Sequence, residues 1–393
     1  MENSLLNKVT IGIKALDSSE KKVRDTNLEL FRIIVMILII AHHYVVNSGL
    51  TAVDGAMYAN PFSLRSIFLF VFGAWGKIGI NCFVLITGYF MCKSRITPKK
   101  FFKLLGEIMF YRIVINVIFW AVGYSKFSIN AFMKMFIPIT NIKTGFSSAF
   151  LVFFLFIPFL NILLKGMTEK THIRLLLLSL FLYVFLGTVP GFSVTMNYVS
   201  WFIVLYFIAA YVRKYPKRIF FNIKLWGIVT SLSIMLCVAS VVLCARYGYS
   251  IAGRKAFSFV TDSNTFLAVL TAFSAFMFFK NVKMKNSVII NTIAASSYGV
   301  LLIHAHSDTM RQWLWKDLLD NVSMYNSQWL ILHAVGSVLL VWLICTVIDH
   351  LRIKFIEVPF FQFWDKYWYR VSDKCREMEH KICEKLRIEE TEK

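Results

Sequence analysis

Charged residues are scarce in this chain of 393 residues. Only 17% are Asp, Glu, Lys or Arg, whereas 58% are hydrophobic and 38 are Phe. A soluble protein of this length needs more polar side chains to cover its core. Apolar runs of close to ~20 residues recur along the chain, and such runs are long enough to cross a bilayer as helices. The composition therefore excludes an ordinary soluble domain and predicts an all-α, polytopic transmembrane protein.

Other features are also missing. The seven cysteines form no CxxC pair, so the sequence predicts neither a disulfide framework nor a zinc site. Residues 1–27 are polar and mixed in charge, without the apolar core of a signal peptide. No internal repeat and no loop long enough for a soluble domain is visible. We expect a cytoplasmic tail over 1–27, a transmembrane domain over 28–350, and a basic, aromatic cytoplasmic or interfacial tail over 351–393.

About ten apolar segments are expected to span the membrane. The second is interrupted by glycines and Lys77, which is compatible with a short interfacial piece followed by a span. The segments are residues 28–47, 66–91, 103–123, 147–164, 173–188, 197–212, 225–245, 264–279, 288–306 and 328–349.

The net charge of +21 is explained by topology. If the N-terminus is cytoplasmic, the segments on that side carry 31 of the 43 Lys and Arg residues. This is the positive-inside pattern, and it predicts that both termini are cytoplasmic. The basic segments then face anionic lipid, so no nucleic-acid partner is expected.

The first apolar segment contains an unusual set of polar residues. Arg32 and His43 are eleven positions apart, so on a helix they share a face to within about 20° and are separated by a rise of roughly 16 Å. His42 points away from that face. Polar groups inside a membrane are costly, and a cation with a titratable base on one stripe indicates function. Because neighbouring side chains diverge by about 100°, the His42–His43 pair is poor geometry for one ion, and no metal site is predicted.

A second polar cluster is expected at the same depth. The ninth segment places His304 and His306 near the outer surface, with Asp308 and Arg311 just beyond. Lys77 and Asn81 lie in the outer half of the second segment. Histidines from two distant segments are therefore predicted to converge.

Four stretches carry a family resemblance. They are NLELFRIIVMILIIAHHYVVNSG, WGKIGINCFVLITGYFM, WFIVLYFIAAYVRKYP and SSYGVLLIHAHSDTMRQWLW. Together they resemble the family-3 integral membrane acyltransferases, the bacterial plasma-membrane enzymes that O-acetylate surface polysaccharides. The resemblance covers roughly Asn27 to Trp364. Its most specific motif is an Arg, ten intervening residues and a His, matched here by Arg32 and His43. The family's basic loop before the third span is matched by Lys99, Lys100 and Lys103.

The resemblance implies an acyl-CoA donor, most simply acetyl-CoA, on the cytoplasmic side and a cell-surface or lipid-linked glycan as acceptor. No bound cofactor is expected. Arg32 offers a bidentate fork for donor phosphates, with the three lysines on the same side. His43 is the candidate general base, and a transient acyl-histidine is an alternative. Lys77, Asn81, Tyr298 and His304 are candidates for acceptor or oxyanion contacts.

Two other classes stay open at the level of sequence. A glycan flippase or polymerase is also polytopic and basic inside, although such proteins usually have more spans or larger outer loops. In a transporter, Arg32, His43 and His304 would line a proton or substrate path. Transfer of label from acyl-CoA to a glycan separates the enzyme from both.

Overall fold

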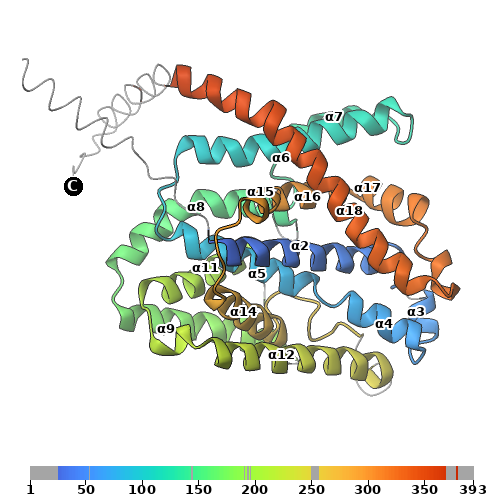
Figure 1. Ribbon diagram of the computed structural model, residues 1–393, viewed down its shortest axis with the longest axis horizontal. Coiled ribbons are helices and arrows are strands. Elements are labelled where there is room, and N and C mark those ends of the chain that lie inside the picture. Colours follow the sequence, from blue (N-terminus) through green and yellow to red (C-terminus); the bar gives the residue numbers. More distant parts are fainter. Residues whose placement is uncertain are drawn as a thin grey trace, which may run out of the picture.

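The computed structural model describes residues 25–368, apart from 53, 143–144, 190, 193, 195 and 249–255, together with Met378. The described residues form helices and contain no β-strand (Figure 1). The α-helices are α2 (Thr26–Val46), α3 (Ala56–Ala59), α4 (Leu64–Phe72), α5 (Gly76–Met91), α6 (Pro98–Ala121), α7 (Ile129–Met135), α8 (Phe146–Gly166), α9 (Glu169–Ser179), α10 (Leu186–Thr188), α11 (Tyr198–Lys214), α12 (Ile223–Leu243), α14 (Phe266–Asn281), α15 (Val288–Ala295), α16 (Ser297–His304), α17 (Asp308–Gln312) and α18 (Leu330–Arg352).

Shorter helical turns join or extend these helices. The π-helical turns are Leu180–Phe185, Cys244–Gly248, Trp313–Leu318 and Ile353–Glu357. The 3₁₀ turns are Arg218–Phe221 and Ser323–Asn326. Most of the two predicted tails, residues 1–24 and 369–393 except Met378, lies outside the described residues.

The predicted all-α, polytopic architecture is confirmed. Within the described part, seven helical segments have the length and hydropathy of a membrane span, and the pair Val288–His304 and Asp308–Asn326, bent by 91°, makes an eighth if it is one span. The predicted segments 197–212 and 264–279 are helical as well, but they form the shorter α11 and α14. The number of spans, ten by sequence, stays a prediction. The seven are Thr26–Val46, Leu64–Met91, Pro98–Ala121, Phe146–Gly166, Glu169–Thr188, Ile223–Tyr247 and Leu330–Trp368.

Helices α2 and α5 form the centre of the bundle. The apolar stretches of Thr26–Val46 and Leu64–Met91 are 56% and 72% buried, against 11% for Glu169–Thr188. Helix α2 contacts α5, α14, α15, α16 and α18. In Figure 1, α6, α7 and α18 lie along one side of this centre, and α9 and α12 lie along the opposite side. A polar side chain on α2 is therefore enclosed by protein rather than exposed to lipid.

The glycines of the second segment allow α5 to pack directly on α2. A Cβ added to Gly79 would lie 2.7 Å from Ile39 Cγ1, and one added to Gly76 would lie 2.2 Å from His42 Cδ2. Only glycine leaves room for the α2 side chains at these positions. The glycine-rich motif thus sets the distance between the two central helices at the level of His42.

The last long helix continues across the predicted boundary between residues 350 and 351. Helix α18 runs on through Ile353–Glu357 to Trp368. Arg352 and Glu357 are only 6% and 8% exposed, so the helix is still packed against the bundle there. The helix therefore continues without a break across this boundary, and the end of the transmembrane domain stays a prediction.

The charge pattern makes a testable prediction about topology. Reporter fusions after Gly166 and Lys285 are expected to be cytoplasmic, and a fusion after Gly253, which lies outside the described residues, is expected to be external. Paired alkaline phosphatase and fluorescent protein fusions measure the location. An external reporter at Lys285 would contradict the ten-span topology.

Candidate active site

Two histidines from distant parts of the chain meet in the interior. His43, near the end of α2, has its Nδ1 atom 2.9 Å from Nε2 of His304, the last residue of α16. The ring centroids are 5.1 Å apart. His304 is completely buried. The structure thus brings together the two histidines that the sequence predicted to converge.

The hydrogen bonds of His304 determine which nitrogens carry protons. His304 Nδ1 lies 2.6 Å from the backbone oxygen of Val300. A carbonyl only accepts, so His304 Nδ1 must donate. When the ring is neutral, its Nε2 is then an acceptor, and His43 must donate to it from Nδ1. A neutral His43 is left with an unprotonated Nε2, for which the described residues provide no hydrogen-bond partner. The pair therefore presents one free imidazole lone pair.

His42 has a different environment from its neighbour. Its Nδ1 is 2.5 Å from the backbone oxygen of Gly73, and its ring packs on Gly76. These contacts hold His42 between α2 and the start of α5. His42 therefore connects two helices, whereas His43 connects to His304.

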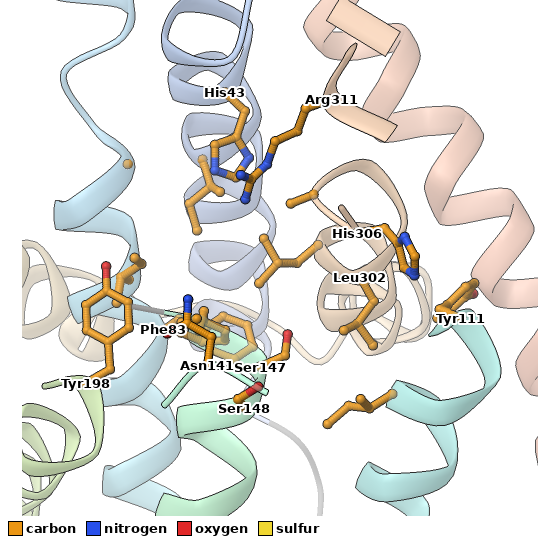
Figure 2. A pocket seen from close by; sticks show the side chains of 18 of the residues that line it. His43, Phe83, Tyr111, Asn141, Ser147, Ser148, Tyr198, Leu302, His306 and Arg311 are labelled. Atoms are coloured by element: carbon orange, nitrogen blue, oxygen red, sulfur yellow. The ribbon is translucent and has the colours of Figure 1, made fainter. Parts of the chain in front are cut away.

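Both His42 and His43 line a polar cavity of about 340 Å³ (Figure 2). This volume lies within the range of small-molecule sites. The polar side chains around it come from six helices, the loop before α8 and the turn between α16 and α17. They are His42, His43, Lys77, Tyr111, Arg112, Thr140, Asn141, Ser147, Ser148, Tyr198, His306 and Arg311.

Two cations, Lys77 and Arg311, line the same cavity as His43. Figure 2 shows the Arg311 guanidinium pointing toward the His43 ring. Lys77 Nζ donates to the hydroxyl of Tyr198 across 2.6 Å. The sequence analysis singled out Lys77, and the structure places it in the cavity wall with His43.

Arg32 lies outside this cavity, next to one of its walls. Its guanidinium forms a 2.7 Å ion pair with Glu29 one turn away. Its Cζ atom is 5.9 Å from the ring centroid of Phe83, which lines the cavity. Phe83 therefore contacts Arg32 and also lines the cavity.

The three predicted donor-site lysines contact other parts of the protein. Lys99 is 2.6 Å from Asp365 and Lys103 is 2.6 Å from Glu357, and both carboxylates belong to the C-terminal extension of α18. Lys100 Nζ is hydrogen-bonded to Ser94 Oγ at 2.5 Å. The sequence predicted the charges but not these partners. Any donor phosphate must share the lysines with them.

Two other candidates do not line the cavity. Asn81 is completely buried, donating to the backbone oxygen of Ser263 at 2.6 Å and accepting from Trp201 Nε1 at 2.9 Å. Tyr298 is 9% exposed and packs against Phe150. The side chain of Asn81 is therefore held by other parts of the protein, and neither Asn81 nor Tyr298 faces the cavity that His43 lines.

The sequence analysis missed a buried charge cluster on the far side of Tyr111. Arg352 is 2.8 Å from Asp349, 2.8 Å from Glu357 and 3.3 Å from Glu107. Tyr111, which lines the cavity, donates to Asp349 at 2.8 Å. Acidic residues within apolar segments, as at positions 107 and 349, were the signal that could have found this cluster.

One comparison with known proteins found a match that covers most of the chain. A family model described as an acyltransferase domain matches residues 25–349, which include the polar cavity and both members of the histidine pair. No curated protein and no solved structure matches the chain.

Proposed function

The chain belongs to acyltransferase family 3, and from this premise we propose that it transfers an acyl group, most simply acetyl, from cytoplasmic acyl-CoA to a hydroxyl of a cell-surface or lipid-linked glycan. The family and the apolar helices make it a multi-pass membrane acyltransferase. A bacterial plasma membrane, acetyl-CoA as co-substrate and the glycan acceptor are parts of the proposal. The observation that carries it is the free Nε2 of His43 beside a polar cavity inside an apolar bundle.

His43 acts as general base in this proposal. Its Nε2 removes the proton from the acceptor hydroxyl while the oxygen attacks the thioester carbonyl carbon. The carbon–sulfur bond then breaks, and the leaving CoA thiolate takes the proton from His43. His304 is a positioning residue, because it holds His43 in the tautomer with Nε2 free and stabilises the positive charge that develops on the ring.

Attack on the thioester places negative charge on the carbonyl oxygen, which requires a donor nearby. Arg311 is the candidate because its guanidinium points toward His43 (Figure 2). An acyl-His43 intermediate would use the same free Nε2, and the geometry serves either route.

Arg32 is proposed to hold the donor on the cytoplasmic side of the cavity. The rise along α2 separates it from His43 by roughly 16 Å. The long, thin pantetheine arm of CoA can extend along this stripe while the nucleotide stays at the Arg32 end. Lys99, Lys100 and Lys103 are proposed to add positive charge at that side. Exposed ion pairs such as Lys99–Asp365 are weak, so phosphate can compete for them.

The donor assignment predicts the behaviour of Arg32 variants. Arg32→Lys keeps the charge but loses the planar fork, so the KM for acetyl-CoA is expected to rise about tenfold with the protein still accumulating in the membrane. Arg32→Ala is expected to raise this KM further. Initial rates at varied acetyl-CoA concentrations measure the effect. Full transfer by Arg32→Ala with an unchanged KM would show that Arg32 only fixes topology.

A transporter or flippase is the second candidate, and one experiment separates it from the enzyme. Purified protein is mixed with acetyl-labelled CoA and a surface glycan fraction, and label on the glycan is measured. The proposal expects label that is released by mild base, as an O-acetyl ester is. Absence of label, together with movement of intact substrate into proteoliposomes, would support the transporter.

A further inference from the structure

The polar cavity is lined by positive charge without a matching negative charge. Lys77, Arg112 and Arg311 all line it. Among its described lining residues there is no Asp or Glu. Enclosed charges are usually paired because an unpaired one is costly in a medium of low dielectric constant. Three cations from three helices around one cavity therefore indicate that the counter-charge comes with a ligand.

The contacts that the cations make inside the protein are mostly to neutral groups. Lys77 donates to a phenol, as described above. Arg112 donates to the backbone oxygen of Lys134 at 2.8 Å. Arg311 has one acidic partner, Asp308 at 2.9 Å, but the Arg311 and Asp308 side chains are 40% and 97% exposed, so this ion pair is weak.

Several donors at the cavity are enclosed but unused. The Nε atoms of Arg112 and Arg311, and both ring nitrogens of His306, are buried without a hydrogen-bond partner among the described residues. Buried polar atoms of this kind are rare in native proteins and call for a missing partner. These nitrogens belong to side chains that line the cavity, so a ligand bound in the cavity would lie close to them.

The acidic residues nearby are kept away from this cavity. Asp349, Glu107 and Glu357 surround Arg352 and are at most 8% exposed. Tyr111 separates them from the cavity, since its ring lines the cavity and its hydroxyl donates to Asp349. The three carboxylates are thus paired with Arg352 behind Tyr111, whereas the cavity in front of Tyr111 is lined by cations alone.

From this arrangement we propose that the glycan acceptor is anionic, with a carboxylate or phosphate on the sugar that is acylated or on its neighbour, and that Lys77 binds this group. The inference rests on the proposed function and names its acceptor class. Charge-assisted hydrogen bonds of this kind fix the register of the sugar as well as its affinity. The hydroxyl that is acylated is then the one that the bound anion places against His43 Nε2.

The donor's own phosphates are a poorer match for this cavity. The α2 residues that line it are Met36, Ile39, His42 and His43, from the His43 end of the helix. Arg32, the candidate for the donor phosphates, lies outside it. A thioester at His43 also leaves its phosphates at the far end of the pantetheine arm.

Chemically modified acceptors test the proposal. The surface glycan fraction is divided into an untreated part, a part whose carboxyl groups are reduced to alcohols, and a part whose phosphates are removed with hydrofluoric acid. Transfer from labelled acetyl-CoA is then measured with each. The proposal expects at least a tenfold loss with one of the treated parts. Equal transfer to all three would overturn it while leaving the acyltransferase function intact, whereas no transfer to the untreated part would contradict the proposed function itself.

Variants of Lys77 provide an independent test. Lys77→Gln is expected to raise the KM for untreated glycan about 10- to 100-fold, as loss of a hydrogen bond to a charged group does, and to leave the KM for acetyl-CoA unchanged. Lys77→Arg is expected to restore most of the affinity, which a purely structural role in packing on Tyr198 does not predict. Lys170→Gln, on an exposed position of α9, is the charge-matched control. A rise in the acetyl-CoA KM alone would assign the cavity cations to the donor and overturn the proposal.

Discussion

Replacement of His43 by alanine is expected to lower acyl transfer by about 10²–10⁴-fold, because the proposed general base is lost. His43 Nε2 is the lone pair left free by the hydrogen bonds of the pair, and His43 lines the cavity in which donor and acceptor are proposed to meet. The variant is expected to accumulate in the membrane at the level of the parent. Initial rates with saturating donor and acceptor, normalised to protein in the membrane, measure the loss.

The neighbouring residue offers a matched control for this prediction. His42→Ala removes the same side chain from the same turn of α2, and it breaks the contact with Gly73. Loss of that hydrogen bond costs roughly 1–3 kcal/mol of stability. A measurable fraction of the transfer activity is nevertheless expected to remain. Activity lost in His42→Ala and kept in His43→Ala would show that the base lies on the other face of the helix.

The second large effect is expected at His304. In His304→Leu, His43 Nδ1 loses its acceptor, and the ring can adopt the tautomer that protonates Nε2. We expect transfer to fall on the order of 10²-fold, since a catalytic histidine held in the wrong tautomer loses up to about 10⁴-fold. The KM for acetyl-CoA is expected to stay close to the parent value, because His304 does not line the polar cavity.

A conservative variant separates this role of His304 from simple packing. In His304→Gln the side-chain oxygen can still accept from His43 Nδ1, so we expect it to retain much more activity than His304→Leu. The two variants have similar volume and occupy the same buried position. If both retain equal activity, His304 does not position His43.

The helical class and most of the span positions could be predicted from sequence, since apolar runs and positive-inside charge reflect the bilayer directly. The eleven-residue separation of Arg32 and His43 also gave their common face from helix geometry alone. The meeting of His43 with His304 was predicted from a weaker argument, namely that both histidines are expected at the same depth in the membrane. The 2.9 Å contact itself depends on how α16 packs beside α2, which a single sequence does not encode in any periodic pattern.

The cavity wall was harder to predict. Arg112 reads as an isolated charge in the third segment, but it lines the cavity and donates to Thr140 Oγ1 of the loop before α8 at 3.5 Å. The partners of Lys99 and Lys103 come from a helix more than 250 residues later in the chain. Asn81 is the opposite case. Its polar side chain in an apolar helix suggested a functional role, whereas the structure shows it hydrogen-bonded to Ser263 and Trp201 and not in the lining of the cavity. Its proposed role in catalysis stays a prediction.

Transfer across the membrane is the central claim, and a double-label measurement in sealed proteoliposomes tests it most directly. The protein is oriented with its cytoplasmic face toward the lumen of the proteoliposome. The lumen contains acetyl-CoA that carries one label on the acetyl group and a second on the nucleotide. Glycan is added outside. We expect the acetyl label to appear on the external glycan while the nucleotide label stays inside. We expect no acetyl label on the glycan with His43→Ala. Export of both labels in a constant ratio, with the glycan unlabelled, would contradict the central claim.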